Sequence, residues 1–220
     1  MEKNILEEKY QSIQARDFYL FFKRTSDIVI SLLGIIVLIP ITIILIVLFS
    51  FGKNKGKLFF YQERIGKNGK KFKIIKFRSM VENAEEILRA DKELYEKYVK
   101  NSYKLLPEED PRMTKLGSFL RKTSIDELPQ FVNILKGEMS FIGPRPVVEE
   151  ELKEYGSKVD KFLSIKPGAT GWWQVKGRSS IKYPERCDLE LYYVDNCSIK
   201  LDVKIFFMEI KRMFTRDSAY

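Results

Sequence analysis

The chain of 220 residues contains no histidine. That absence excludes histidine-based general acid–base catalysis, Ser-His-Asp triads and most zinc sites. Only two cysteines occur, Cys187 and Cys197, and their spacing matches neither a zinc ribbon nor a CxxC motif. We interpret them as reduced thiols and expect the part of the chain outside any membrane to lie in a reducing compartment.

Acidic residues are outnumbered by basic ones, 30 to 39, which gives a net charge of +9. A balance this basic indicates a polyanionic partner: nucleic acid, an anionic membrane surface or a phosphorylated substrate. Hydrophobic residues make up 45% of the chain, enough for a packed core. The length allows one large domain, or one domain with an anchor.

Charged residues are absent from residues 28–52, a run long enough to cross a hydrocarbon core. The run starts too far in and is too long for a cleavable signal peptide. Pro40 lies near its middle, where it removes a backbone hydrogen bond, so each half is about 18 Å of helix. Two alternatives are open: a spanning helix, or a helix that enters one leaflet, breaks at Pro40 and returns.

Positive residues flank the run on both sides and mark cytoplasmic ends, which favours the re-entrant form; they are Lys23 and Arg24 before it and Lys53, Lys55 and Lys57 after it. Two further segments have a membrane-facing pattern. Phe18, Phe21 and Phe22 recur at helical spacing before the run. Near the C-terminus an apolar helical stripe, opposite lysines and arginines, predicts either an interfacial helix or a core-packing one; its members are Val203, Phe206, Phe207, Ile210, Met213 and Phe214.

The remaining pattern alternates helices with loops. Residues 58–80 read as two short strands around the turn at residues 67–69. Helices are expected over residues 81–99, 113–135 and 149–163, and residues 107–111 form a linker or turn. Glycine- and proline-rich loops are expected at residues 143–146 and 167–171.

Two adjacent carboxylates, Asp126 and Glu127, lie beside cations at an expected helix start. Ser124 and Glu127 have the spacing of a capping box, and Asp126 suits a helix N-terminus electrostatically. From this segment alone, helix capping is the favoured interpretation. Its surroundings indicate another use, because several separate loops each carry cations: Lys76, Arg78, Arg112, Lys115, Arg121 and Arg145.

Arginine forks match phosphate oxygens in two-point geometry, although each arginine taken singly is ordinarily a solvated surface residue. A carboxylate pair among such groups suits Mg²⁺ and a diphosphate, since Mg²⁺ takes few carboxylates and completes its shell with phosphates and water.

At these residues the sequence resembles the monotopic phosphoglycosyl transferases, also called the bacterial sugar transferase family, of the small single-domain type. The resemblance runs from about Lys23 to the C-terminal helix. Its motifs occur in order: YQERIGKNGKKFKIIKFRSM, DPRMTKLGSFLRKTSIDELPQFVNILKGEMSFIGPRPV, KPGATGWWQVKGRSS and YYVDNCSIKLDVKI.

The resemblance implies a mostly α fold with a small β-element. A re-entrant membrane helix and interfacial amphipathic helices would carry a catalytic domain on the cytoplasmic face of the bacterial inner membrane. The expected segments are an interfacial segment over residues 1–22, the re-entrant helix over residues 23–52 broken at Pro40, the catalytic domain over residues 53–200 and a basic amphipathic helix over residues 201–220.

The resemblance also implies the chemistry. Asp126 would attack the β-phosphorus of a UDP-sugar, releasing UMP, and polyprenol (undecaprenyl) phosphate would then take the phospho-sugar from Asp126. Glu127 would assist, Mg²⁺ would bind Asp126 and the diphosphate, and Arg78, Arg121 and Arg145 would bind phosphate. The partners implied are a UDP-sugar, polyprenol phosphate and inner-leaflet lipids, with no nucleic acid; the sugar, the glycoconjugate pathway and the oligomeric state are not determined by the sequence.

The sequence departs from the family pattern at two positions. Ile39 precedes the membrane proline where many members have serine, and Glu190 stands where aspartate is common; we assign Glu190 no catalytic role. Three alternatives are kept: a membrane-tethered nucleic-acid-binding protein, a membrane phosphohydrolase that uses the same aspartate, and a non-catalytic scaffold.

Overall fold

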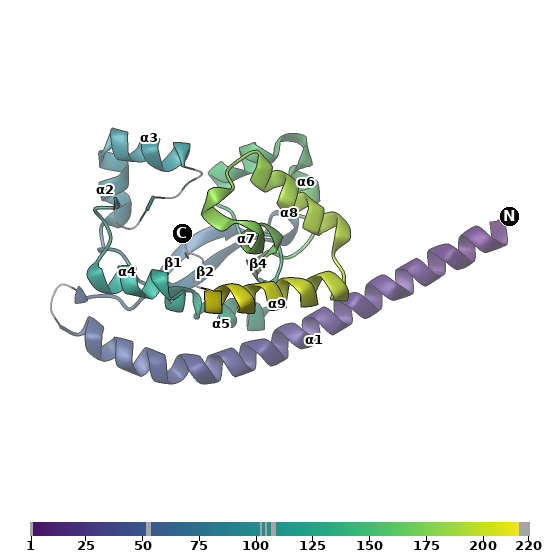
Figure 1. Ribbon diagram of the computed structural model, residues 1–220, viewed down its shortest axis with the longest axis horizontal. Coiled ribbons are helices and arrows are strands. Elements are labelled where there is room, and N and C mark those ends of the chain that lie inside the picture. The colour runs from purple at the N-terminus through teal and green to yellow at the C-terminus, as the bar shows by residue number, and fades with distance from the viewer. Residues whose placement is uncertain (1, 52–53, 102, 104, 107–108, 216–220) are drawn as a thin grey trace.

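One long helix, α1 (Glu2–Phe49), lies along a mostly helical domain (Figure 1). The computed structural model describes residues 2–51, 54–101, 103, 105–106 and 109–215, without the side chains of residues 2–13, 179 and 213–215. Met1, Gly52, Lys53, Pro107, Glu108 and residues 216–220, which belong to segments predicted above, lie outside the described residues.

The domain confirms the expected combination of many helices with a small β-element. Its strands are β1 (Phe59–Ile65), β2 (Lys71–Phe77), β3 (Ser140–Ile142) and β4 (Gly168–Thr170). Its helices are α2 (Ala84–Ala90), α3 (Lys92–Lys100), α4 (Lys115–Lys122), α5 (Gln130–Lys136), α6 (Val159–Phe162), α7 (Trp172–Lys176), α8 (Glu185–Asn196) and α9 (Ile199–Thr215), with the 3₁₀ turns η2 (Lys67–Gly69), η3 (Ile125–Glu127), η4 (Glu149–Lys158) and η5 (Arg178–Ser180).

The helix α1 continues through Pro40 without dividing into two helices, and the predicted return of the chain within a membrane at Pro40 stays a prediction. Proline removes one backbone hydrogen bond, which bends a long helix without having to end it. Just beyond the proline the Thr42 hydroxyl donates to the Leu38 carbonyl at 2.8 Å, a side-chain contact that also favours bending. Figure 1 shows α1 curved along the domain. The boundary expected between residues 22 and 23 lies inside this same helix.

Polar contacts attach the first part of α1 to the domain. Arg24 donates to the carbonyls of Ile134 at 2.8 Å and Leu135 at 2.7 Å, at the C-terminal end of α5, where carbonyls have no partner inside the helix. The buried Asp27 carboxylate accepts from the Phe141 backbone N–H at 2.8 Å and the Ser140 hydroxyl at 3.0 Å. These contacts fix the helix against β3.

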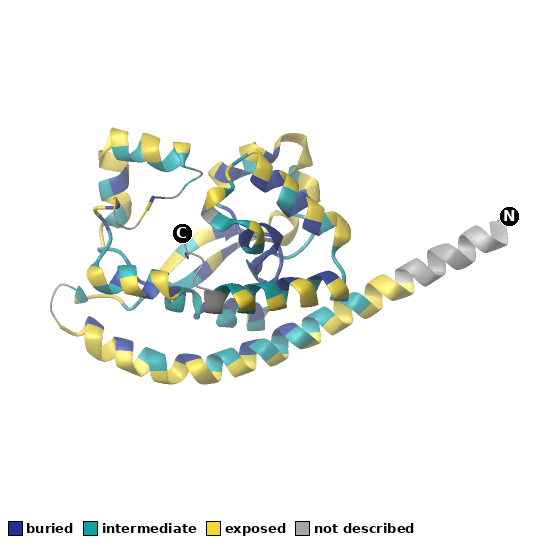
Figure 2. Ribbon diagram, viewed as in Figure 1, coloured by how far each residue is buried: buried dark blue, intermediate teal, exposed yellow. Residues whose placement is uncertain are grey.

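The part of α1 beyond Pro40 is attached by apolar packing. Leu45 and Phe49 share a core cluster with Phe77 of β2 and Leu120 of α4. Figure 2 shows the buried residues of α1 along the side that faces the domain, and exposed residues along the opposite side. The opposite side is apolar: Ile36 is 65% exposed and Ile43 is 60% exposed.

The hairpin of β1 and β2 confirms the predicted strands and their turn. The strands are antiparallel, with Phe59 opposite Phe77. Asn68 and Gly69 have φ values of 56° and 75°, a conformation that these two residue types tolerate best. The hairpin carries Lys76 and Arg78 toward the centre of the domain.

The strands β3 and β4 pair in parallel and bring the two glycine-proline loops together. Ser140 lies opposite Gly168. A Cβ on Gly168 would lie 2.1 Å from the backbone nitrogen of Gly143, so this approach requires glycine. Arg145 follows directly on the first loop.

Each of the three helices expected in the domain is interrupted. Residues 81–99 hold α2 and α3, because the Asp91 side chain accepts from the Leu94 N–H at 2.9 Å and starts a new helix. Residues 113–135 hold α4, η3 and α5. Residues 149–163 hold η4 and α6. Gly156, inside η4, has φ 50° and interrupts the helical backbone there.

The C-terminal helix α9 both packs on the core and exposes apolar side chains. Leu201 and Ile205 are buried, whereas Val203 is 46% and Phe207 63% exposed. Of the predicted stripe, Phe206 packs against the core cluster that contains Leu201 and Ile205, and the interfacial interpretation of its exposed members stays a prediction. The side chains of Met213 and Phe214 lie outside the described part of the chain.

Candidate active site

The carboxylates Asp126 and Glu127 lie on η3, in a sharp connection between α4 and α5. Ser124 turns the chain with φ 55° and its side chain makes no capping hydrogen bond. The Glu127 carboxylate instead accepts from the Lys76 ammonium of β2 at 2.6 Å. The capping-box interpretation is therefore wrong, because the Ser124 side chain makes no capping hydrogen bond and the Glu127 carboxylate binds Lys76 instead.

A cavity of about 510 Å³ opens beside these carboxylates. It is lined by all five site residues that the sequence predicts in the domain: Asp126, Glu127, Arg78, Arg121 and Arg145. They come from β2, the end of α4, η3 and the loop after β3. The fold thus gathers groups that are scattered along the chain into one site.

Asp126 is a buried carboxylate at the edge of this cavity, with 5% of its surface exposed. Burial raises its pKa to about 6, and the negative charge of Glu127 adds to the rise, while Lys76 and Arg121 oppose it. Within the described residues it forms no ion pair. A carboxylate of this kind is ionised at neutral pH and more basic than an ordinary aspartate, which suits a nucleophile.

The pKa of Glu127 is shifted in the opposite direction from that of Asp126. Burial would raise its pKa, but the charge and hydrogen bond of Lys76, with smaller contributions from Arg145 and Arg178, lower it to about 2. Glu127 therefore stays ionised and holds the Lys76 ammonium near Asp126. Two neighbouring carboxyls with separated pKa values can serve separate roles.

Arg78 lines the cavity, but its guanidinium is occupied by backbone. It donates to the carbonyls of Lys57 at 2.7 Å and Asn54 at 2.5 Å, and it lies 5.1 Å from the centre of the Phe49 ring. These contacts hold the connection between α1 and β1. The predicted phosphate contact of Arg78 stays a prediction.

Arg121 and Arg145 are more available to a ligand. Arg121 donates from Nε to the Ser79 hydroxyl at 3.1 Å. The backbone N–H of Arg145 donates to the Glu190 carboxyl at 3.1 Å, while its guanidinium makes no hydrogen bond or ion pair with any residue that the structure describes. Arg145 is thus held by its backbone, and its charged end lines the cavity.

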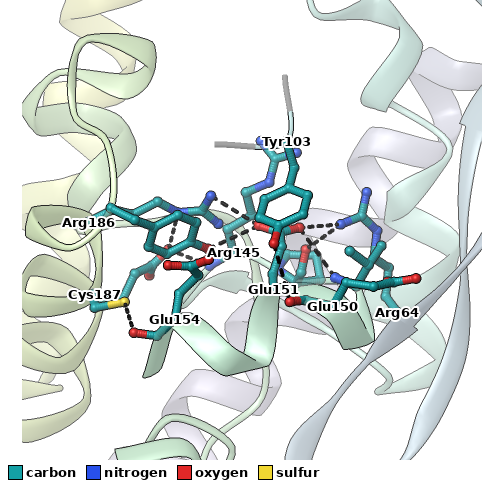
Figure 3. Close-up of polar contacts among 12 residues, drawn as sticks. Arg64, Tyr103, Arg145, Glu150, Glu151, Glu154, Arg186 and Cys187 are labelled. Carbon is teal, nitrogen blue, oxygen red and sulfur yellow. Dashed lines mark hydrogen bonds and ion pairs between the residues drawn. The ribbon is translucent and has the colours of Figure 1, made fainter. Parts of the chain in front are cut away.

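A buried charged cluster surrounds Arg145 (Figure 3). Glu151 of η4 accepts from Arg64 at 3.4 Å and from Arg186 at 3.2 Å. The Tyr183 hydroxyl donates to the same carboxylate at 3.0 Å. The charge of the nearby Arg145 also acts on Glu151 and, with those of Arg186 and Arg64, lowers the pKa of this carboxyl against the effect of burial.

Glu190 completes this cluster from α8. It is fully buried, and burial raises its pKa to about 8 against the opposing effects of Arg186 and of the Arg145 backbone N–H. Its carboxyl accepts from the Arg145 backbone N–H, and that it has no catalytic role stays a prediction.

Sequence reasoning missed three partners of the site: Lys76 as the partner of Glu127, Arg178 as a lining residue, and the cluster around Glu151. Lys76 could have been found from the two-residue alternation of β2, which places Ile74, Lys76 and Arg78 on one face. Arg178 lies in the KGRSS motif but was given no role. The residues of the Glu151 cluster come from distant segments, so no short sequence pattern predicts that they meet.

Metal-binding capacity is limited on the protein side. No group of three or more cysteine, aspartate or glutamate side chains converges in the part of the chain that the structure describes. The site offers one carboxylate without an ion pair, Asp126, and one held by lysine, Glu127.

Comparisons with known proteins show which family the sequence matches. The sequence model of the family described as bacterial sugar transferase matches residues 18–216. The chain is 45% identical over 204 residues to a UDP-galactose-lipid carrier transferase of Erwinia amylovora and 42% identical over 203 residues to an undecaprenyl-phosphate galactose phosphotransferase of Salmonella typhimurium. Both alignments cover 91% of this chain but 42% of the relative, so the chain spans less than half the length of these relatives.

A third relative is similar in size. The exopolysaccharide production protein ExoY of Sinorhizobium fredii is 41% identical over 202 residues, which cover 90% of this chain and 88% of that protein.

Proposed function

The chain belongs to the bacterial sugar transferase family, and from this premise we propose that it transfers a sugar-1-phosphate from a UDP-sugar to polyprenol phosphate during polysaccharide assembly. The observation that carries the proposal is Asp126: a buried carboxylate without an ion pair, beside a cavity that also receives Lys76, Arg121 and Arg145. The names of these relatives supply the substrate classes.

The proposed reaction has two displacements at one phosphorus. A carboxylate oxygen of Asp126 attacks the β-phosphorus, the bond from that phosphorus to the bridging oxygen breaks, and UMP leaves with that oxygen. An oxygen of polyprenol phosphate then attacks the same phosphorus, and the bond to Asp126 breaks. Polyprenyl-diphospho-sugar is released and the free carboxylate returns, which is covalent catalysis with ping-pong kinetics.

The cations of the site support both steps. Lys76 and Arg121 lie near enough to Asp126 to lower its pKa against the effect of burial. Arg145 brings an unpaired guanidinium into the same cavity. Fixed positive groups stabilise the negative charge that builds up on phosphate oxygens in the transition state.

We further propose that Mg²⁺ is bound with the substrate. Mg²⁺ prefers one or two carboxylates together with phosphates and water, and a single available carboxylate at Asp126 fits that preference. The metal would reduce the repulsion between an anionic carboxylate and an anionic diphosphate. Glu127 would act mainly by keeping Lys76 in place.

The packing of α1 supports a monotopic, re-entrant membrane anchor. Asp27 and Phe49 both contact the same folded domain, yet they are separated by about 33 Å of helix at 1.5 Å per residue. That length equals the hydrocarbon core of a bilayer. A spanning helix would leave one of these residues on the side away from the domain. We therefore place the exposed apolar face of α1 in one leaflet, with the domain on the cytoplasmic face of the membrane.

The deciding experiment measures turnover of the purified chain with Mg²⁺, undecaprenyl phosphate and a panel of UDP-sugars. We expect UMP release, a lipid-linked product and, without the lipid, a phospho-sugar adduct on Asp126. Asp126→Asn should lower turnover at least about 1,000-fold, since the nucleophile is lost. The matched control Glu149→Gln removes an exposed carboxylate outside the cavity and should leave turnover unchanged.

Three results would contradict the proposal. Full turnover by Asp126→Asn excludes the covalent step. Water acting as acceptor, with no requirement for the lipid, indicates a phosphohydrolase. Salt-dependent nucleic-acid binding without any turnover indicates a binding protein.

The anchor is tested separately by labelling single cysteines, in a background without Cys187 and Cys197. Leu20→Cys and Lys55→Cys should be labelled from the same side of a sealed vesicle. Labelling from opposite sides would establish a spanning helix.

A further inference from the structure

Arg178 is a cavity-lining arginine to which the proposed reaction above gives no role. It begins η5 with φ 48°, a conformation that is uncommon for a residue other than glycine. The loop therefore holds this residue in a costly backbone position, beside the site that contains Asp126 and Glu127.

The Arg178 side chain is connected to the C-terminal helix. Its guanidinium lies 3.8 Å from the Glu209 carboxylate of α9, and both side chains are more than four-fifths buried. Glu209 in turn accepts from Arg212, one turn later on α9, at 3.1 Å. Glu209 thus contacts both arginines and joins Arg178 to α9. The charge of Arg178 reaches the catalytic pair, because it helps to lower the pKa of Glu127.

The helix α9 lies on the anchor side of the molecule. Figure 1 shows α9 beside α1, with α2 and α3 on the side away from α1. Val203 and Phe207 of α9 are exposed apolar side chains on a helix that also exposes Lys204 and Lys211. A helix with this surface suits the headgroup region of a membrane.

The two substrates must reach the cavity from different sides. A lipid-linked phosphate stays at headgroup level while its chain remains in the bilayer, so it enters from the side of α1 and α9. The nucleotide sugar is water-soluble, and the opposite wall of the cavity is lined by Tyr98 and Asn101, from α3 and its end.

Building on the proposed function, we infer that Arg178, positioned by Glu209 of α9, binds the phosphate of the polyprenol acceptor. In-line displacement makes the departing UMP phosphate and the arriving lipid phosphate pass through the same region, opposite Asp126. The nucleotide sugar has further contacts through its base, ribose and sugar. The acceptor has a single phosphate, so its binding depends much more on one arginine.

The test separates the two half-reactions. The full chain is placed in nanodiscs of phosphatidylethanolamine and phosphatidylglycerol. The first half-reaction is adduct formation on Asp126 from the active UDP-sugar without lipid acceptor; the second is consumption of the isolated adduct by undecaprenyl phosphate. Arg178→Gln should slow the second about 10- to 100-fold, the loss expected for a hydrogen bond to a charged group, and the first less than about 3-fold.

Two further variants identify the role of each residue. Glu209→Gln should raise the KM for undecaprenyl phosphate about 3- to 10-fold and change kcat little, because Glu209 positions Arg178 and does not touch the substrate. Lys211→Gln removes an exposed charge from the same helix and should change the KM less than about 2-fold. An equal effect of Lys211→Gln would replace the inference with general attraction of α9 to anionic lipid.

The outcome for Arg178 is distinguishable from the outcome for the proposed function. If the unaltered chain forms no adduct, the proposed function fails. If the adduct forms and Arg178→Gln slows both half-reactions equally, or slows neither, only the acceptor assignment is overturned. Should Arg178→Gln form no adduct at all, Arg178→Lys is measured by the same ratio of half-reactions, and an equal loss in both again overturns the assignment.

Discussion

Apolar and charged side chains have exchanged their usual places between the anchor helix and the catalytic domain. On α1, Ile36 is 65% exposed and Ile43 60% exposed. In the domain, Arg186 is 1% exposed and Glu190 is fully buried. Each region reverses the rule that large apolar side chains lie inside and charges outside.

The two reversals have different consequences. The exposed apolar face of α1 has no protein partner among the described residues, so it indicates an apolar surrounding. The buried charges of the domain lie against one another: Glu151 pairs with Arg64 and Arg186, and Arg145 lines the cavity beside them. The first region therefore reports where the protein sits, and the second reports what kind of ligand it holds.

The largest expected effect comes from breaking the buried cluster. Glu151→Gln removes the carboxylate shared by Arg64 and Arg186, which leaves Arg64 buried without its ion-pair partner and Arg186 with only the 3.9 Å contact to Glu190. We expect the free energy of unfolding to fall by about 3–5 kcal/mol, as measured by denaturant unfolding in detergent.

The control for this prediction is an exposed ion pair. Glu149→Gln removes one of the two carboxylates that pair with Lys71, and both side chains of this pair are at least half exposed. It should cost about 0–1 kcal/mol. If the two variants cost the same, burial does not distinguish these charges.

The second prediction concerns the exposed face of α1. Ile36→Lys places a charge where we propose hydrocarbon, and should weaken binding to liposomes by about 2.5–3.5 kcal/mol without unfolding the domain. Co-sedimentation with vesicles measures this change. Tyr61→Lys on β1, a site with a similar exposure of 55%, should leave vesicle binding unchanged. Equal effects at both positions would contradict a specific membrane face.

Features encoded locally could be predicted from the sequence. The uncharged run gave α1, and the turn at residues 67–69 gave the hairpin, because asparagine and glycine accept the left-handed backbone required there. Asp126 and Glu127 were found as a pair, but their neighbouring residues alone favoured a helix cap. Only the resemblance to a family indicated catalysis, and the cavity now supports it.

Features made by distant residues could not be predicted. Lys76 pairs with Glu127 across 51 positions of the chain, and Arg64 meets Glu151 across 87. Pro40 is a case in which a local pattern is not enough. A proline in mid-helix predicts a break, but α1 continues through it, and both of its halves pack on the domain. Tertiary contacts decided each of these cases.

The third prediction tests the polar attachment of the anchor. Asp27→Ala leaves the Phe141 N–H and the Ser140 hydroxyl without their buried acceptor. We expect a loss of about 1–3 kcal/mol in the free energy of unfolding. The control Thr25→Ala removes an exposed hydroxyl that bonds only within α1 and should cost less than about 0.5 kcal/mol. No difference between them would mean that apolar packing alone attaches α1.

The smallest expected effect is the response of the catalytic pair to pH. Burial raises the pKa of Asp126 to about 6, so the nucleophilic carboxylate form is present above that pH and is lost as the pH falls through it. The value of kcat/KM for the UDP-sugar should therefore fall about tenfold per pH unit below about 6. Glu127, whose pKa is lowered to about 2, stays ionised over that range. A fall that begins only near pH 4 would show an Asp126 that titrates like an exposed aspartate.

The variant Lys76→Gln separates burial from charge in that response. The Lys76 ammonium lowers the pKa of Asp126, so its removal should move the acid limb of the profile to higher pH, whatever it does to the maximal rate. An unchanged acid limb would mean that Lys76 acts on Glu127 alone. A shift upward would show that the Lys76 cation opposes the effect of burial on the pKa of Asp126, and that both together set the pH range in which the nucleophile is ionised.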